Sequence, residues 1–428
     1  MNIATEPKNF FTGAWPPASA EGFRVPYRVF TDPACYAAEQ EKIFRGETWS
    51  FVGLDAEIPN TGDFKTTFIG DTPVLVVRDT SGKVSVFKNR CTHRGALLMR
   101  EQRGNAKSFN CVYHQWSFDL AGALLSIPMR RGVHGQGGMP AEFDMARHGL
   151  DSLRVGILNG VIFASFSETV EPLADYLGEE ITATVQRIFN RPIKILGDVR
   201  QYIHGNWKLY SDNVRDPYHA SLLHLFHNTF GLYRATQTGA THMDASKRHS
   251  VLWAKAAPTS ASEDKEVYKD VRAYNTEFRL QDPSVLAGRR EFDDGITLVI
   301  NAIFPNLVIQ QIANTLAVRQ IVTYGPGAFE LVWTQFGYQD DDEEMQTIRM
   351  KQSNLIGPAG LISMEDGEAV EIVQAGIIRD GEQTSIIGMG GGRAENADHL
   401  TTEGAIIGFW ENYCRYLEIP QHAADTDK

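Results

Sequence analysis

The chain has 428 residues, of which 43% are hydrophobic, so it is long enough to build two or three domains with sizeable cores. Its formal net charge of -12 gives no electrostatic reason to expect nucleic acid or an anionic membrane as a partner. The first residues lack a basic end followed by an apolar core, and no apolar run approaches the roughly eighteen residues of a membrane span, so we expect a cytoplasmic protein with no membrane partner.

The first 166 residues contain one expected helix and then a region of short strands. Asp32-Pro33 opens a segment, residues 34–44, whose apolar residues recur at helical intervals. From Trp49 to about Phe166 the pattern changes to short alternating runs, which are separated by glycine-containing turns. The sequence therefore predicts an all-β domain over residues 45–166, preceded by a helix.

Two short motifs in this region each carry one cysteine and one histidine: Cys91-Thr-His93 and Cys111-Val-Tyr-His114. Two cysteines and two histidines at this spacing can hold a [2Fe-2S] cluster, with the thiolates on one iron and the imidazoles on the other. A structural zinc site is the alternative, but zinc fingers usually bring their cysteines as one pair and their histidines as another. The order of ligands therefore favours the Rieske type of cluster. Gln115 departs from that pattern, in which glycine usually follows the second histidine.

The rest of the chain predicts helices that cover an antiparallel sheet. A helix is expected at residues 173–189 and a strand at 193–203. The polar stretch 255–265 has little apolar periodicity and predicts a mobile loop that could act as a lid over a pocket. Further strands are expected at residues 298–304, 306–312, 316–323 and 329–338, and helices at 340–355 and 360–376. The expected fold class is α+β, with an all-β domain beside a helix-covered sheet.

A second metal site is suggested by His219 and His224, five residues apart, with Asp216 three residues before the first. Residues five apart do not stack on a regular α-helix, so we expect a locally widened turn to bring the imidazoles together. Two ordinary helical histidines are the alternative. A one-electron carrier needs something to reduce, however, and a mononuclear Fe(II) centre requires two histidines and one carboxylate. Asp366, in Ser-Met-Glu-Asp-Gly, is the candidate carboxylate.

Together the two motifs make the chain resemble the large (α) subunit of the Rieske non-haem iron ring-hydroxylating oxygenases over nearly its whole length. The resemblance implies that residues 1–44 and 167–428 form the catalytic mononuclear iron domain, with His219, His224 and Asp366 as ligands. Glu365 matches a neighbouring position that does not bind the metal.

The same resemblance gives roles to two further polar residues. Asn213 matches a pocket asparagine near the iron. Asp216 matches a carboxylate that links His219 to a cluster histidine, expected to be His114, of a neighbouring subunit. The alternative for Asp216 is a helix N-cap, which Pro217 at the first helical position would suit, and both can hold at once.

Partners are also implied by the resemblance. The large subunits form a ring of three, and many relatives add three small β subunits to give an α3β3 assembly. NADH-derived electrons arrive through a reductase, sometimes with a separate ferredoxin. Reduced Fe(II) then activates O2 for hydroxylation of an aromatic ring.

Arg319 is the residue that says most about the substrate. An arginine in an otherwise apolar strand is costly unless a carboxylate of the protein or of the substrate pairs with it. The tract resembles that of oxygenases of terephthalate, salicylate and anthranilate, in which an arginine here faces the substrate carboxylate. The candidate apolar walls, each of which could equally be core, are Val214, Leu223, Ile303, Ile356 and Ile362.

These features predict an aromatic carboxylate as substrate, with anthranilate 1,2-dioxygenation to catechol as the first choice. The alternatives are salicylate 5-hydroxylation, ortho-halobenzoate dioxygenation and terephthalate dioxygenation. A different class, an electron-transfer protein with a Rieske domain but no oxygenase activity, is disfavoured by His219, His224 and the late carboxylate.

Overall fold

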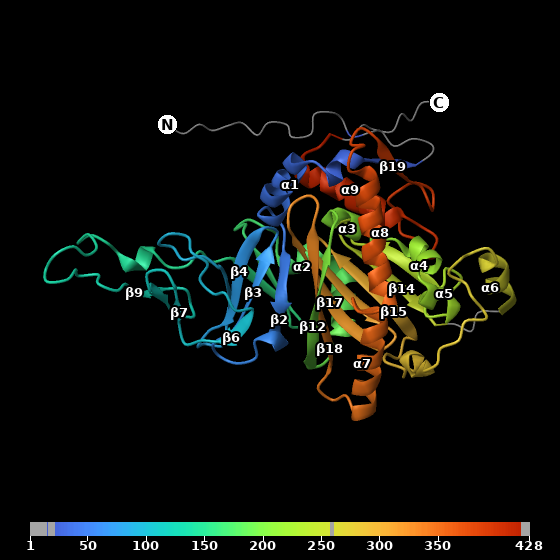
Figure 1. Cartoon of the computed structure of the whole chain (residues 1–428), viewed down its shortest axis with the longest axis horizontal. Coiled ribbons are helices and arrows are strands. Elements are labelled where there is room, and N and C mark those ends of the chain that lie inside the picture. The colour runs from blue at the N-terminus through green and yellow to red at the C-terminus, as the bar shows by residue number, and fades with distance from the viewer. Residues whose placement is uncertain (1–14, 16–21, 257–260, 421–428) are drawn as a thin grey trace. The chain divides into compact units, whose positions relative to one another are not determined.

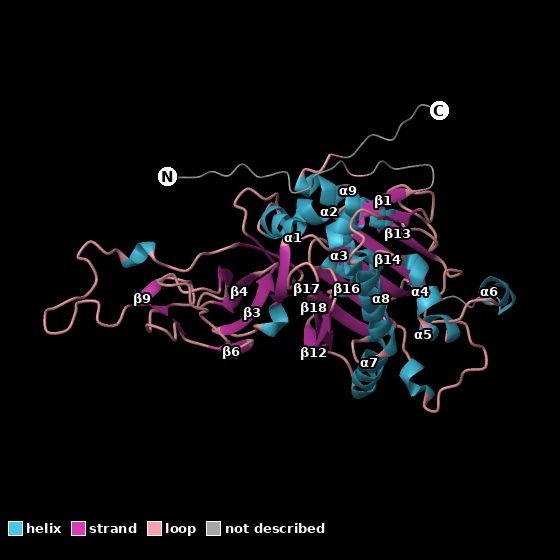
Figure 2. Ribbon diagram, turned by 45° about the horizontal axis from the view of Figure 1, so that its top comes forward, coloured by secondary structure: helices cyan, strands magenta, loops and turns pink. Residues whose placement is uncertain are grey.

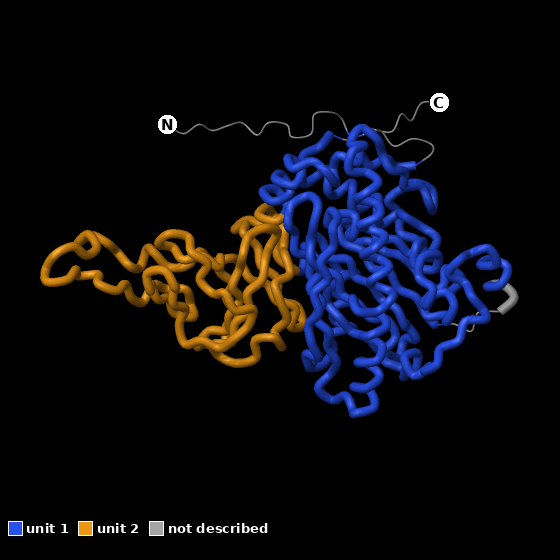
Figure 3. Tube along the Cα trace, viewed as in Figure 1, with its two compact units in different colours: residues 1–43, 174–428 blue, residues 44–173 orange. Residues whose placement is uncertain are grey.

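The computed structural model describes residue 15, residues 22–256 and residues 261–420, which form two compact units (Figures 1 and 3). The small unit comprises Phe44–Leu173. The large unit combines Met1–Ile43 with Ala174–Lys428. The chain therefore leaves the large unit, builds the small unit and then returns.

The small unit is built from antiparallel sheets, as its short alternating runs predicted. One sheet has the strand order β5-β4-β3-β6, and two three-stranded sheets have the orders β10-β11-β2 and β7-β8-β9. The strands are β2 Ser50–Leu54, β3 Asp63–Ile69, β4 Thr72–Arg78, β5 Val84–Lys88, β6 Arg103–Asn105, β7 Phe109–Asn110, β8 Ser117–Phe118, β9 Leu124–Ser126, β10 Arg154–Leu158 and β11 Val161–Ser165. Cys91 and Cys111 belong to one buried apolar cluster with Phe64, Phe109 and Phe118, so the two cysteine-bearing loops rest on this unit's core.

The large unit is organised by a seven-stranded antiparallel sheet of order β12-β18-β17-β16-β15-β14-β13 (Figure 2). Nearly every residue of β16, β17 and β18 is buried, which explains why these strands read as long apolar runs. The strands are β12 Ile193–Ile203, β13 Gly239–Met243, β14 Ser250–Lys255, β15 Ile296–Ile303, β16 Leu307–Ile312, β17 Thr315–Thr323 and β18 Phe329–Tyr338. All five strands predicted in this region are confirmed. A small two-stranded sheet pairs β1 Phe23–Pro26 with β19 Thr384–Ile387.

Helices cover this sheet and carry the second pair of motif histidines. Helix α8 contacts α3, α5 and β12, and α7 contacts β17 and β18, so both long helices lie over the sheet (Figures 1 and 2). The helices are α1 Pro33–Glu39, α2 Leu173–Ile188, α3 Trp207–Asn213, α4 Pro217–Leu223, α5 Leu225–Thr229, α6 Ala261–Tyr268, α7 Glu343–Ile356, α8 Leu361–Ile377 and α9 Gly404–Leu417. Within the described ranges, no helix combines the length and the apolar character that a bilayer crossing needs.

The expected lid loop at residues 255–265 is wrong in its second half, where α6 begins at Ala261. Residues 257–260 lie outside the described residues. The polar sequence gives no helical period, but buried polar contacts hold the helix in place. Asp264 is 1% exposed and accepts hydrogen bonds from Arg234 and Thr236, while the Tyr268 hydroxyl donates to Ser221. Tertiary contacts thus decide the secondary structure of a segment whose own sequence does not indicate a helix.

Candidate metal centres and active site

The two cysteine-bearing loops of the small unit have matching turns. The Cys91 carbonyl accepts a hydrogen bond from the Gly95 amide at 3.0 Å, and the Cys111 carbonyl accepts one from the Gln115 amide at 2.9 Å. Gly95 and Gln115 both have positive φ, at +76° and +56°. The turn therefore requires the left-handed conformation at this position, which glycine adopts without strain and glutamine does not. The loop therefore keeps the same turn, although Gln115 replaces the glycine that usually follows the second histidine.

The four predicted cluster ligands fit an iron-sulfur group. The rings of His93 and His114 lie 4.6 Å apart, and burial raises the pKa of the Cys91 thiol, with the hydrogen bond to the Cys111 thiol adding to the effect. His93 Nδ1 is buried and has no hydrogen-bond partner among the described residues. A buried ring nitrogen without a partner is costly, so this atom is available for a metal.

Ligand spacing also separates the cluster from a zinc site. One zinc ion would draw four ligand atoms around a single point. In the described part of the chain, however, His219, His224 and Asp366 form the one group of three or more metal-binding side chains whose ligand atoms all lie within 4.8 Å. The two cysteines and two histidines of the small unit form no such group among the described residues, which favours a two-iron cluster over a single zinc ion.

The second pair of histidines is positioned by a break between two short helices, not by the expected widened turn. Helix α4 ends at Leu223, and His224 has extended backbone angles, φ -86° and ψ 108°, before α5 begins at Leu225. The prediction of a π-like turn is therefore wrong. The helix stops one residue before the second ligand, and the extended residue turns its imidazole toward the first.

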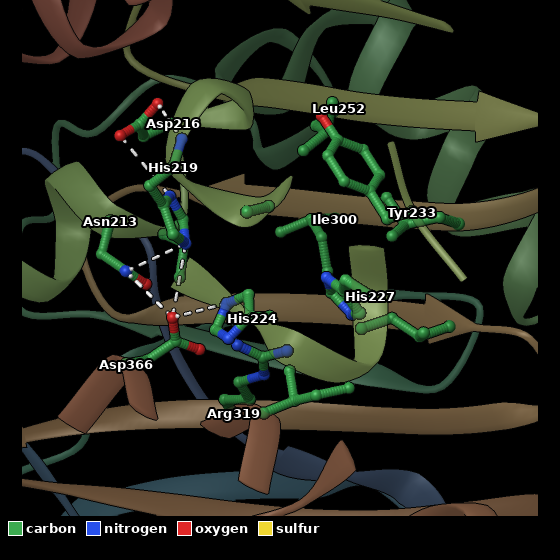
Figure 4. Close-up of a pocket in the computed structure, with 15 residues that line it drawn as sticks. Asn213, Asp216, His219, His224, His227, Tyr233, Leu252, Ile300, Arg319 and Asp366 are labelled. Carbon is green, nitrogen blue, oxygen red and sulfur yellow. Dashed lines mark hydrogen bonds and ion pairs between the residues drawn. The ribbon is translucent and has the colours of Figure 1, made fainter. Parts of the chain in front are cut away.

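The two imidazoles meet a carboxylate from the distant helix α8 (Figure 4). Asp366 Oδ1 lies 3.4 Å from His219 Nε2 and 3.2 Å from His224 Nε2. Burial alone would raise the pKa of Asp366, but the two histidines hold it well below its usual range. Two imidazole nitrogens and one ionised carboxylate converging on one point fit a mononuclear Fe(II) centre with open positions.

Neighbouring side chains orient these three ligands. Asn213 Nδ2 lies 3.0 Å from Asp366 Oδ1 and 3.3 Å from His219 Nε2, so the predicted pocket asparagine does lie at the site. Glu365 Oε2 lies 2.8 Å from His224 Nδ1. A carboxylate on the outer nitrogen fixes the tautomer and ring orientation of a metal-binding histidine. The sequence indicated Glu365 only as the neighbour of Asp366, and the structure shows this contact.

The two oxygens of Asp216 serve different neighbours. Oδ1 accepts hydrogen bonds from the backbone amides of Tyr218, at 2.8 Å, and His219, at 3.2 Å, which makes Asp216 the N-cap of α4. Oδ2 lies 3.5 Å from His219 Nδ1, an ion-pair distance. The capping role is confirmed, and the second oxygen remains directed to the outer nitrogen of a metal ligand.

A cavity opens beside His219, His224 and Asp366. Of the predicted apolar walls, Val214 and Ile362 line it, and so does Arg319. Leu223 lines a neighbouring hollow of about 880 Å³. Ile303 and Ile356 are buried and are not among the residues that line this cavity.

Sequence reasoning missed most of the apolar wall, which consists of Leu252, Leu298, Ile300 and Ile312. Leu298 and Ile300 lie on β15, as does Ile303, but side chains alternate between the faces of a strand. Ile303 is an odd number of residues from both, so it faces the other side of the sheet. The prediction of Ile303 therefore selected a strand that does line the cavity, but a residue on its other face.

Arg319 is buried in the cavity wall without an anion. It is 5% exposed, its Nη1 donates to the Tyr210 hydroxyl at 2.7 Å, and its guanidinium lies 4.2 Å from the centre of the Trp333 ring. No ion pair of Arg319 is found among the described residues, and its Nε has no hydrogen-bond partner. A buried, uncompensated cation is expensive, so the site is prepared for an anion from outside the chain.

His227 also lines the cavity, and no sequence pattern singled it out. It lies on α5, is 3% exposed, and packs its ring 4.9 Å from His224 and 5.9 Å from Tyr233. Burial, followed by the charge of His224, lowers the pKa of His227 well below its usual value. It is three positions along the chain from the predicted metal ligand His224, and that proximity is the only signal that could have pointed to it.

Fold and sites together define an iron-dependent redox protein with one cluster unit and one mononuclear-iron unit. Comparison with known families agrees: residues 48–136 match the Rieske [2Fe-2S] domain, and residues 185–418 match the ring hydroxylating alpha subunit catalytic domain. The chain belongs to the ring-hydroxylating oxygenase large-subunit family. It is a Rieske non-haem iron oxygenase that carries a [2Fe-2S] cluster and binds mononuclear iron.

The similarity to known proteins extends over almost the whole chain. The anthranilate 1,2-dioxygenase large subunit of Burkholderia cepacia is 51% identical over 93% of this chain and 94% of its own length. A terephthalate 1,2-dioxygenase alpha subunit of Comamonas sp is 45% identical over 93% and 96%, and the salicylate 5-hydroxylase large component of Ralstonia sp is 42% identical over 94% and 96%. Naphthalene 1,2-dioxygenase with bound indole has the same fold, with a TM-score of 0.75 at 21% identity over 94% and 93% of the two chains.

Proposed function

We propose that this oxygenase acts on an aromatic monocarboxylate, with anthranilate as the first candidate. The observation that carries the proposal is the buried Arg319, which faces the cavity beside the iron ligands and has no anion of its own among the described residues. A substrate carboxylate would complete a bidentate pair with the guanidinium and fix the orientation of the ring. The relatives that act on anthranilate, salicylate and terephthalate support this class of substrate.

A single positive side chain in the cavity favours one carboxylate over two. Arg319 is the one lysine or arginine among the described residues that line the cavity. Terephthalate would bring a second carboxylate, which would be buried without a partner at a cost of several kcal/mol. The cavity therefore supports anthranilate or salicylate better than a dicarboxylate.

The proposed reaction adds both atoms of O2 to carbons 1 and 2 of anthranilate. Two electrons from NADH, delivered through a reductase, and two protons complete the diol. The diol carboxylate takes up one more proton as it loses ammonia and carbon dioxide to leave catechol. When bound, the cluster supplies single electrons and the mononuclear iron supplies oxygen activation. The residues of the chain hold the ring, orient the ligands and exclude water from the site.

The roles of the residues follow from their positions. Arg319 would hold the carboxylate, and the aliphatic wall around Ile300 and Ile312 would hold the ring. Asn213 and Glu365 would keep the ligand side chains in position, because each contacts one or two of them directly. Asp216 would link His219 to His114 of a neighbouring subunit, which places the electron path between two copies of the chain.

The proposed assembly is a ring of three large subunits, joined by three small β subunits and served by a reductase and, in some systems, a ferredoxin. Relatives described as large subunits or oxygenase components support this, because those words imply further subunits. Sedimentation of the chain, alone and co-expressed with a small subunit, tests the stoichiometry. A monomer under both conditions would contradict the ring.

The substrate proposal is tested by replacing Arg319 with methionine, which keeps the length and apolar stem but removes the charge. Iron-loaded oxygenase is held under anaerobic conditions, and the binding of anthranilate and of aniline is measured by equilibrium dialysis. We expect anthranilate to lose about 2 to 5 kcal/mol of binding free energy, and aniline, which has no carboxylate, to bind as before.

A matched control is Arg279→Met. Arg279 belongs to the same unit, lies on the surface and donates only to backbone carbonyls. It should leave the binding of both ligands unchanged. If Arg319→Met weakens anthranilate and aniline equally, or neither, then Arg319 has a structural role. Product analysis with chemically reduced enzyme then follows: catechol plus ammonia from anthranilate supports the reaction, and gentisate from salicylate reassigns it.

A further inference from the structure

His227 presents two unused ring nitrogens at the cavity. Nδ1 and Nε2 are both buried, and neither has a hydrogen-bond partner among the described residues. The side chain is 3% exposed and belongs to the cavity wall (Figure 4). Leaving a buried donor or acceptor unsatisfied is costly, so an imidazole with two such atoms needs an explanation.

The surrounding side chains make no hydrogen bond to His227 among the described residues, and most of their polar atoms are engaged elsewhere, except Asn228 Oδ1, which also lacks a partner. The Tyr233 hydroxyl, whose ring packs against His227, donates to the Pro217 carbonyl at 2.9 Å. Asn228 Nδ2 donates to the Ser221 carbonyl at 2.6 Å. His224, on the other side, directs Nε2 to Asp366 and Nδ1 to Glu365. Because His227 itself lines the cavity, a polar group of a molecule bound there is the candidate partner for one of its ring nitrogens.

The cavity therefore has two polar points in a mainly aliphatic wall. Arg319 offers a positive charge, and His227 offers hydrogen bonds, while Leu252, Leu298, Ile300 and Ile312 surround the rest. A flat apolar ring with an anionic group and a second, uncharged polar group matches this pattern. An aromatic acid without the second group would leave both nitrogens of His227 unsatisfied.

The second group belongs on the metal side of the ring. The ring of His227 packs 4.9 Å from the ring of the iron ligand His224, so a substituent held by His227 lies close to the metal. Oxygen addition at carbons 1 and 2 requires these two carbons to face the metal. The substituent is then on carbon 2, ortho to the carboxylate.

We propose that His227 binds an ortho amino or hydroxyl group and so selects ortho-substituted aromatic acids over unsubstituted ones. The inference rests on the proposed function, since Arg319 must hold the carboxylate for the word ortho to apply. An imidazole in its neutral form can accept a hydrogen bond from an amino group, and can donate to or accept from a hydroxyl group. Anthranilate and salicylate are thus the matching ligands, and a halogen or hydrogen at carbon 2 is a poor match.

The test compares ligands that differ at carbon 2 alone. Dissociation constants of anthranilate, 2-methylbenzoate and benzoate are measured by equilibrium dialysis on anaerobic, iron-loaded wild-type oxygenase. A methyl group has nearly the size of an amino group but makes no hydrogen bond. We expect anthranilate to bind about tenfold tighter than 2-methylbenzoate, since one satisfied buried hydrogen bond is at stake. Equal affinities in the wild type would overturn the proposal without the use of any variant.

The variant His227→Phe keeps an aromatic ring in the packing and removes both nitrogens. We expect it to bind anthranilate about tenfold more weakly, while benzoate changes less than twofold and iron content per chain stays at the wild-type value. His227→Gln, which keeps a donor and an acceptor, should restore most of the preference for anthranilate over 2-methylbenzoate. A merely structural role would weaken all three acids together, and that result contradicts the proposal.

Failure of the proposed function gives a different result. If Arg319→Met leaves benzoate and anthranilate binding unchanged, the carboxylate is not held there, whatever His227 does. If Arg319→Met weakens both acids but His227→Phe leaves the ratio of anthranilate to 2-methylbenzoate affinity intact, only the inference about His227 fails. The two variants thus separate recognition of the anion from recognition of its ortho neighbour.

Discussion

At the scale of single residues, the carboxylate of Asp216 makes two separate contacts, one with each oxygen. One oxygen caps helix α4, and the other lies beside the outer nitrogen of His219. A capping role alone would be filled by asparagine nearly as well, because asparagine is as good an N-cap as aspartate. The negative charge is needed only for the contact with the histidine.

We therefore expect Asp216→Asn to fold normally and to keep both metals, but to turn over about 10 to 100 times more slowly, as is typical when an outer partner of a metal-bound histidine is altered. Thermal unfolding tests the fold, iron content tests the retention of both metals, and the rate of product formation measures the turnover. Asp282→Asn is the control, because Asp282 also caps a short helix before a proline but lies far from the metal in sequence and on the surface. Normal turnover by Asp216→Asn would show that the charge is dispensable.

Gln115 is a second informative residue, because the matching position of the first loop is Gly95. Its φ of +56° costs a non-glycine residue about 1 kcal/mol, and its exposed side chain makes one weak hydrogen bond, 3.4 Å from Nε2 to the Val112 carbonyl. We expect Gln115→Gly to stabilise the small unit by roughly 0.5 to 1 kcal/mol, measured as the midpoint for thermal loss of the cluster absorbance. Gly95→Gln, the reverse change in the twin loop, should destabilise by a similar amount.

At the scale of elements, the strands were predictable and the helix ends at the metal site were not. Strand β12 is predicted with its observed bounds, Ile193–Ile203, and β15 to β18 are found within a few residues, because long runs of apolar residues leave few alternatives. The end of α4 before His224 has no glycine or proline to signal it. Contacts with the distant Asp366 and Glu365 decide where that helix stops, and no local pattern contains them.

Residue types and spacing, which chemistry constrains, were enough to select His219, His224 and Asp366, and the structure brings these three together. The wall of the cavity could not be predicted in this way, since it depends on which face of each strand turns inward. Ile303 and Ile300 are equally apolar, but they are an odd number of residues apart, so their side chains lie on opposite faces of the sheet. His227 is polar, but its importance comes from atoms that lack partners, a property of packing that no sequence pattern records.

Helix α7 depends on a buried ion pair that has a predictable pH dependence. Arg349 Nε lies 2.7 Å from Asp341 Oδ2, and both side chains are at most 4% exposed. Burial would raise the pKa of Asp341, but hydrogen bonds from Arg349 and from the Tyr338 amide lower it below 3.8. The carboxylate therefore contributes stability at pH values above 3.8, and this contribution is lost as pH falls through the lower pKa of the folded state.

We expect Asp341→Asn to lower the free energy of unfolding by about 3 kcal/mol, near the low end for a broken buried pair, since Glu291 still pairs with Arg349. The loss should be constant between about pH 8 and pH 5. It should shrink below about pH 4, where the carboxylate of the unfolded wild type takes up a proton, and should vanish once the folded carboxylate is protonated as well. Urea unfolding across this range is the measurement. Asp340→Asn, next to it on the surface, should change stability by less than about 0.5 kcal/mol.

At the scale of the whole molecule, each unit carries a complete set of ligands for its own metal group. We expect Asp366→Asn to lose the mononuclear iron and to keep the [2Fe-2S] cluster, so that iron falls from three to two atoms per chain while acid-labile sulfide stays at two. Cys91→Ser should do the opposite and leave one iron. Metal analysis after reconstitution tests both, and joint loss of all iron in either variant would show that the units do not fill independently.

The break at His224 also has a consequence for motion. The residue is the joint between two helices of only seven and five residues, and helices so short have little stability of their own. A bound ion would tie this joint to α8, about 140 residues further along the chain, and so clamp segments that local structure holds weakly. Emptying the metal site should therefore loosen the amides of α4 and α5 to hydrogen exchange before any strand of the sheet responds. Because His227 lies on α5, the ordering of the pocket and the filling of the metal site become one event.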